Sequence, residues 1–69
     1  MAKRKYNRIK AILAEQGKSN KELAALLDMS ERTVSRWSTN GRQPSVEMLY
    51  EIAKVLKVEV RELLVASMK

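Results

Sequence analysis

Apolar residues recur along this 69-residue chain at helical spacing, and no segment alternates apolar and polar residues for long. Ser19, Ser30 and Ser45 each precede an apolar run, where a helix cap is favoured. Gly17 and the loop 39–44 are typical of helix ends. The pattern predicts an all-α fold of five short helices, the last of them marked by Val60, Leu63 and Leu64. The first four have these inner faces: Tyr6, Ile9, Ile12 and Leu13; Leu23, Ala24 and Leu27; Val34 and Trp37; and Val46, Leu49, Ile52, Ala53 and Leu56.

The second and third predicted helices are joined by only three residues, Asp28-Met29-Ser30. So short a connection cannot fold the two helices back antiparallel, and it leaves them crossing steeply. The second helix opens with Ser19 and Glu22, which have the spacing of a capping box. Residues 19–38 are therefore predicted to form a helix-turn-helix.

The third predicted helix, about residues 31–38, has a polar outward face. If Val34 and Trp37 are buried, a rotation of 100° per residue directs Arg32 and Arg36 away from the core. Arginine pairs with guanine in the DNA major groove, and serine and threonine are permissive there. An ordinary solvated helix surface is the alternative interpretation. The residues beside the two arginines on this face are Glu31, Thr33 and Ser35.

The charge of the chain is positive and unevenly distributed. Fourteen basic and eight acidic residues give a net charge of +6. Residues 1–44 hold ten of the basic and four of the acidic residues, whereas residues 45–69 hold four of each. This imbalance predicts a polyanion partner bound through the first two-thirds of the chain. Nucleic acid, an anionic membrane surface and an acidic protein would all satisfy the charge alone.

The composition excludes several kinds of chemistry. The chain contains neither cysteine nor histidine, so disulfides, zinc sites of the usual ligands and histidine-based catalytic dyads are excluded. No apolar run approaches the ~20 residues that a membrane span requires, and no signal-peptide segment is apparent. We expect one cytoplasmic, non-enzymatic domain over residues 1–69, with a basic arm at residues 1–5 and no cofactor, metal or membrane association.

The segment 19–37, SNKELAALLDMSERTVSRW, resembles the helix-turn-helix of the phage-repressor/Cro type, often called XRE. Pro44-Ser45 and the run 52–56 also resemble that family, so the similarity extends over about residues 6–65. The resemblance implies a compact five-helix, lambda-repressor-like domain of bacterial or phage type. It also implies a homodimer that binds double-stranded operator DNA as a transcriptional regulator.

The resemblance also implies roles for individual residues. Positions that read bases in the family are occupied here by Glu31, Arg32, Thr33, Ser35 and Arg36. Positions that bind DNA phosphates are occupied by Lys10, Asn20, Lys21, Ser30, Thr39, Asn40, Gly41 and Arg42. Exposed amides at helix N-termini bind phosphate oxygens, which independently supports the phosphate assignment at the start of the second helix.

The sequence departs from the family pattern at three helix ends. The family usually places glycine after its second, third and fourth helices, where a left-handed residue ends each helix. Those places hold Asp28, Asn40 and Lys57 here. Asparagine and aspartate tolerate the left-handed conformation, whereas Lys57 is expected to cost about 1 kcal/mol.

The C-terminal segment carries more apolar residues than one face of a short helix can bury. We therefore predict a homodimer interface formed by Val60, Leu64, Val65 and Met68. A frayed apolar tail is the alternative. Trp37 could serve as a base-stacking platform, but its helical phase with Val34 favours a place in the core.

Two classes of function fit these observations. The first is a DNA-binding transcriptional regulator that binds an inverted-repeat operator as a dimer. The second is a helical protein-interaction module, such as an antitoxin that binds a partner protein. The polar face with Arg32 and Arg36 favours DNA, because a peptide partner would favour an apolar groove. No small-molecule effector is implied.

Overall fold

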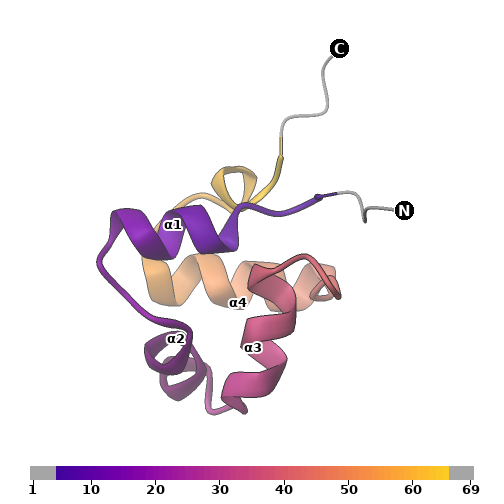
Figure 1. The fold of residues 1–69 in the computed structure, drawn as a ribbon. Coiled ribbons are helices and arrows are strands. Elements are labelled where there is room, and N and C mark those ends of the chain that lie inside the picture. The colour runs from indigo at the N-terminus through magenta and orange to yellow at the C-terminus, as the bar shows by residue number, and fades with distance from the viewer. Residues whose placement is uncertain (1–4, 66–69) are drawn as a thin grey trace.

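The computed structural model describes residues 5–65 and contains helices only, apart from one isolated β-bridge. The α-helices are α1 (Ile9–Glu15), α2 (Asn20–Leu27), α3 (Glu31–Ser38) and α4 (Val46–Leu56), followed by a 3-10 helix η1 (Val60–Leu63). Figure 1 shows α1 and η1 at the top of the view, α4 across the middle, and α2 and α3 at the bottom. Helix α2 packs against α3 and α4, while η1 packs against α4 and α1.

The core draws residues from all five elements, as the apolar pattern predicts. Ile9, Leu23, Val34, Ile52 and Leu63, one from each element, are the largest fully buried side chains. Burying an aliphatic side chain of this size stabilises a fold by roughly 1.5–3 kcal/mol. The remaining buried apolar residues are Ile12, Leu13, Ala24, Trp37, Ala53 and Leu56.

The predicted serine caps are all present. The side chains of Ser19, Ser30 and Ser45 accept hydrogen bonds from backbone amides in the first turns of α2, α3 and α4. The Ser19 capping box is complete, because the amide of Ser19 also donates to Glu22 Oε1 at 2.7 Å. These caps satisfy amides that a helix N-terminus leaves without partners.

A left-handed residue follows each of the four α-helices. Gly17, Asp28, Asn40 and Lys57 have φ angles between 57° and 67°. After α4, the amide of Val58 donates to the carbonyl of Ala53 at 3.0 Å, which closes the helix in the Schellman pattern. The expectation that Asp28, Asn40 and Lys57 occupy glycine-favouring positions is confirmed.

The start of α1 differs from the prediction. Tyr6 was expected on the inner face of the first helix, but α1 begins at Ile9 and Tyr6 is 55% exposed. The preceding residues are not helical and pair with the C-terminal segment: the amide of Val65 donates to Tyr6 O, and that of Arg8 to Leu63 O. This pairing turns Asn7 inward, where it is buried.

The fifth predicted helix is a 3-10 helix of four residues. It ends at Leu63 because Leu64 is extended, with φ −111° and ψ 148°, and bridges to Asn7. The backbone of Leu64 thus pairs with a distant segment instead of continuing a helix. Leu64 was expected within the last helix and lies outside it, and its side chain is 39% exposed.

The apolar pattern also gives a wrong prediction for Val46. As the first residue of α4 it is 69% exposed, although it was expected on the inner face. Met48 and Leu49 of the first turn are half-buried and pack against the core, whereas full burial along α4 begins at Ile52. Among residues 5–65, none of the helices is both long and apolar enough to cross a bilayer.

Replacing Lys57 by glycine should raise the free energy of unfolding by about 1 kcal/mol, because glycine adopts the left-handed conformation without steric cost. Chemical denaturation followed by circular dichroism measures this change. Lys54→Gly, in the right-handed backbone of α4, is the matched control and should lower stability by about 1 kcal/mol. Equal losses in the two variants would show that the backbone of Lys57 carries no strain.

Candidate nucleic-acid interface

Helices α2 and α3 form the pair that the sequence predicted, and their connection is tight. The amide of Met29 donates to the carbonyl of Ala24 at 2.9 Å, and only Asp28 and Met29 separate the last residue of α2, Leu27, from the Ser30 cap of α3. Ala24 is buried at this crossing, and Met29 packs against the core. Ser30 then opens α3 by accepting from the amide of Thr33 at 3.2 Å. The start of α3 is therefore fixed relative to α2.

The two sides of α3 differ in burial as the helical phase predicts. Val34, Trp37 and Ser38 are buried, whereas Glu31, Arg32 and Arg36 are exposed. Burial of Trp37 to 6% exposure leaves little of its ring for stacking on a base. Thr33 and Ser35 lie at intermediate burial on the flanks of the exposed face.

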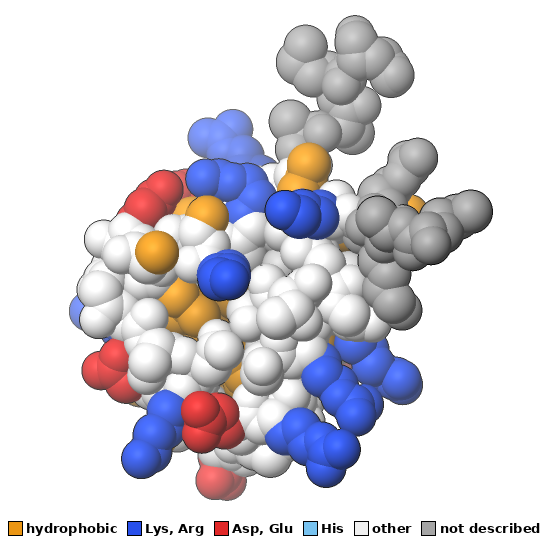
Figure 2. Space-filling view, in the orientation of Figure 1, with side chains coloured by type: hydrophobic (Ala, Val, Ile, Leu, Met, Phe, Trp, Pro, Cys, Tyr) orange, Lys and Arg blue, Asp and Glu red, His pale blue; other side chains and the backbone are white. Residues whose placement is uncertain are grey.

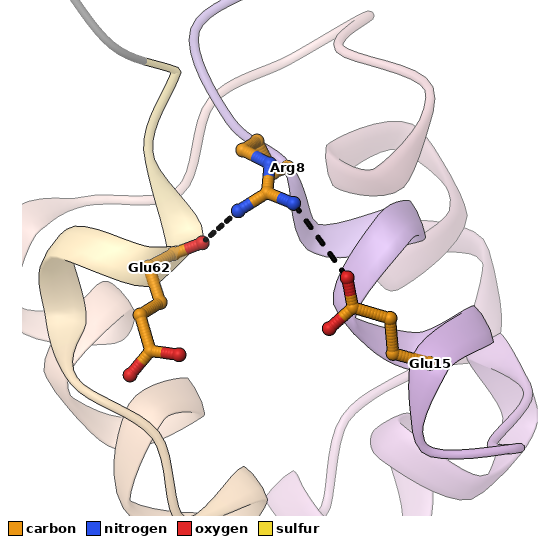
Figure 3. Close-up of polar contacts among 3 residues, drawn as sticks. All are labelled: Arg8, Glu15 and Glu62. Carbon is orange, nitrogen blue, oxygen red and sulfur yellow. Dashed lines mark hydrogen bonds and ion pairs between the residues drawn. The ribbon is translucent and has the colours of Figure 1, made fainter.

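The exposed arginines have no carboxylate partner among residues 5–65. The ion pair found in this part of the chain joins Arg8 Nη2 to Glu15 Oε2 at 3.7 Å, and Arg8 also donates to the carbonyl of Glu62 at 3.2 Å (Figure 3). Figure 2 shows several Lys and Arg side chains gathered at the lower right, in the region where Figure 1 places α3. Arg32 and Arg36 therefore keep their charge available to an anion.

Two hydroxyl groups at the start of α3 share one hydrogen bond. Ser30 Oγ and Thr33 Oγ1 are 2.9 Å apart, and one of them donates to the other. One hydroxyl proton is thereby used, and the second remains free to donate to an acceptor outside the protein. Both Ser30 and Thr33 retain solvent exposure.

The loop after α3 has its backbone amides turned back onto the helix. The amides of Gly41 and Arg42 both donate to the carbonyl of Arg36, at 2.9 and 3.2 Å. These two amides are therefore not free to bind a phosphate, and Gly41, which the resemblance assigned to phosphate binding, has no side chain to do so. The side chains of Thr39 and Arg42 remain exposed.

Asn40 does not fit the phosphate-binding role implied by the resemblance. Its side chain is only 7% exposed and is occupied by hydrogen bonds to Tyr6, Asn7 and Gln43. Asn40 is therefore a structural residue of the loop. Nothing in the local sequence indicates its partners, since Asn7 lies 33 residues away.

The remaining predicted phosphate residues come from α1 and α2. Asn20 and Lys21 are the first two residues of α2, and Lys21 is exposed. Lys10 on α1 shares a groove of about 530 Å³ with Thr39 and with two further cations, Lys5 and Arg8. The fold thus brings Lys10 beside the loop that follows α3.

The predicted dimer residues are only partly exposed. Leu64 and Val65 are 39% and 41% exposed, whereas Val60 is half-buried against the core and Met68 lies outside the described residues. Tyr6, which the sequence pattern placed in the core, is hydrogen-bonded through its carbonyl to Val65 and is exposed beside it. We call Tyr6, Leu64 and Val65 the terminal apolar patch. The predicted basic arm includes Lys3 and Arg4, which also lie outside the described residues.

Comparison with known proteins agrees with this arrangement. A model of a helix-turn-helix family, HTH_3, matches residues 9–63. The chain is also similar to a crystal structure described as that of "a putative DNA-binding protein from Bacteroides fragilis". The two are 46% identical with a TM-score of 0.83, and the similarity covers 86% of this chain and 95% of the other. No curated protein matches the chain significantly.

Replacing Ser30 by alanine should lower the free energy of unfolding by about 1 kcal/mol, because the amide of Thr33 loses its cap. Ser35→Ala is the matched control in the same helix, since no side-chain hydrogen bond of Ser35 is found among residues 5–65; it should change stability by less than about 0.5 kcal/mol. Thermal and urea unfolding measure both. A loss in Ser35→Ala as large as that in Ser30→Ala would contradict the capping role.

Proposed function

Because this chain belongs to the XRE-type helix-turn-helix family, we propose that it is a transcriptional regulator that binds specific sequences of double-stranded DNA as a homodimer. Members of this family are DNA-binding domains and are typically non-enzymatic. The observation that carries the proposal is the exposed face of Arg32 and Arg36, which have no carboxylate partner among residues 5–65, on a helix held in place by buried Val34 and Trp37.

Helix α3 has the dimensions and the chemistry for the major groove. With its side chains an α-helix is roughly 10–12 Å across, and the groove is about 12 Å wide. Arg32 and Arg36 lie one turn apart on the exposed face, so both reach base edges when the helix lies in the groove. Each has the fork of donors that matches guanine O6 and N7. Glu31, Thr33 and Ser35 are the proposed neighbouring base contacts.

The DNA backbone is bound by cations and hydroxyls around α3. Asn20 and Lys21 stand at the start of α2, and Thr39 and Arg42 follow α3 in the chain. Ser30 supplies a hydroxyl at the helix start, and Lys10 adds a charge beside Thr39. Phosphate contacts from both ends of the helix would fix its register along the groove.

A dimer through the terminal apolar patch would present two copies of α3. Leu64 and Val65 are exposed apolar residues on a segment whose backbone is held by Tyr6 and Asn7. Covering them with the same surface of a second copy removes apolar area from water. Two recognition helices of such a dimer read half-sites about one helical turn apart, roughly 34–36 Å.

Selection from a pool of random double-stranded DNA, at about physiological salt, tests the proposal. An enriched inverted repeat is the expected result, and its half-sites define the operator. Enrichment of a single half-site would retain sequence-specific binding and remove the dimer. A pool with no enriched sequence would overturn the proposal and favour the alternative of a protein partner.

Arg32→Ala or Arg36→Ala should cost roughly 1–3 kcal/mol at one base pair and relax specificity there, because a bidentate contact to guanine is lost. Lys10→Ala and Arg42→Ala should instead weaken binding to all sequences alike and reduce the salt slope by about one. Fluorescence anisotropy on duplexes with single base changes measures both effects. The same behaviour in all four variants would contradict this division of roles.

Leu64→Lys or Val65→Lys should shift the protein to a monomer in sedimentation velocity, because a charge in the interface must be desolvated without a partner. Val46→Lys is the matched control: Val46 is 69% exposed on α4, outside the patch, and its substitution should leave the sedimentation coefficient unchanged. An unaltered profile for both patch variants would contradict the proposed interface.

A further inference from the structure

Three side-chain amides join the N-terminal segment to the loop after α3. Asn40 Oδ1 accepts from the backbone amides of Tyr6 at 2.9 Å and Asn7 at 3.0 Å, and from Gln43 Nε2 at 3.0 Å. Asn40 Nδ2 donates to the carbonyl of Asn7 at 3.1 Å. Asn7 Nδ2 in turn donates to Gln43 Oε1 at 2.8 Å, which closes a ring. We call Asn7, Asn40 and Gln43 the amide network.

The network is also anchored to two helices. Asn7 Nδ2 donates to the carbonyl of Trp37, near the end of α3, at 2.9 Å. Asn7 Oδ1 accepts from the amide of Ile9 at 3.1 Å, where α1 begins. Asn7 and Asn40 are 4% and 7% exposed, so these bonds are largely shielded from water. These hydrogen bonds therefore hold the end of α3, the start of α1 and the loop together as one unit.

Two exposed cations are neighbours in the chain of residues that the amide network holds. Arg42 lies between Asn40 and Gln43 in the chain, and its own amide donates to the carbonyl of Arg36. Lys5 immediately precedes Tyr6, whose amide is held by Asn40. Both side chains are exposed, although the backbone next to each is fixed. Lys5 and Arg42 are 37 positions apart in the sequence, and the network ties the backbone beside both to the end of α3.

We propose that the amide network positions Arg42, and with it Lys5, to bind DNA phosphates beside the recognition helix; this inference rests on the proposed function. A cation on a loop that is already ordered loses less conformational freedom on binding than one on a mobile loop. Asn7, Asn40 and Gln43 are therefore positioning residues that act through Arg42 and Lys5. A network that only stabilises the fold would leave the contribution of Arg42 unchanged when it is disrupted.

Asn40→Gly tests the hydrogen bonds of the Asn40 side chain separately from the backbone conformation of position 40. Glycine adopts the left-handed backbone of position 40 at no steric cost, so the substitution removes the four side-chain hydrogen bonds without adding backbone strain. Gln43→Ala is a second variant, which removes the bonds on the side of Arg42 and leaves the contacts of Asn40 with Tyr6 and Asn7. Circular dichroism at the assay temperature selects the variant that is folded.

A double-mutant cycle measures the coupling between Asn40 and Arg42. The probe is a mixed-sequence duplex of about 30 base pairs, roughly three helical turns, because phosphate contacts do not depend on sequence. Arg42→Ala should weaken binding by roughly tenfold in the wild-type background and by less than about twofold in Asn40→Gly. Asn40→Gly alone should reduce the salt slope by about one, as Arg42→Ala does.

Lys21→Ala is the matched control, because Lys21 lies on α2 and makes no hydrogen bond with the network. It should weaken binding by the same factor in both backgrounds. An equal effect of Arg42→Ala with and without Asn40 would overturn the positioning role while leaving DNA binding intact. If the wild-type protein binds neither this duplex nor any selected sequence, the proposed function is overturned, and the positioning role with it.

Discussion

A helix of eight residues does not persist alone in water, so α3 depends on the burial of Val34 and Trp37. Their place in the core determines which way the rest of the helix faces. Because Arg32 and Arg36 lie on the side opposite these two residues, they are held outward on a rigid support. The position of α3 is further determined by its two ends, one at the Ser30 cap and the other at the carbonyls of Arg36 and Trp37.

The ends of the helices show how one backbone requirement is met by different residues. Each α-helix is followed by a left-handed residue, and only Gly17 adopts that conformation freely. At Lys57 the requirement is met by a side chain for which it is unfavourable. Asn40 meets it with a side chain that also holds the N-terminal segment. The departure from glycine at this position therefore adds a connection between distant parts of the chain.

The arginines differ in whether the fold already engages their charge. Arg8 is engaged by Glu15 and by the carbonyl of Glu62, so it contributes to the structure around α1 and η1. The arginines of α3 and the loop have no such carboxylate partners among the described residues. An ion pair at the surface contributes little to stability, whereas an unpaired cation contributes most where it meets an anion. The one ion pair among the described residues thus marks Arg8 as a cation engaged within the fold.

The sequence alone determined the elements whose signals are local. The serine caps, the left-handed helix ends and the α2–α3 pair are confirmed, because capping bonds span three residues and helical phase spans one turn. The tertiary structure decided the positions of Tyr6, Asn7, Leu64 and Asn40. There the backbone of residues 6–8 pairs with residues 63–65, and Asn40 binds an amide 33 residues away. Periodicity describes which face of a helix is apolar, but it carries no information about hydrogen bonds between segments that only the folded chain brings together.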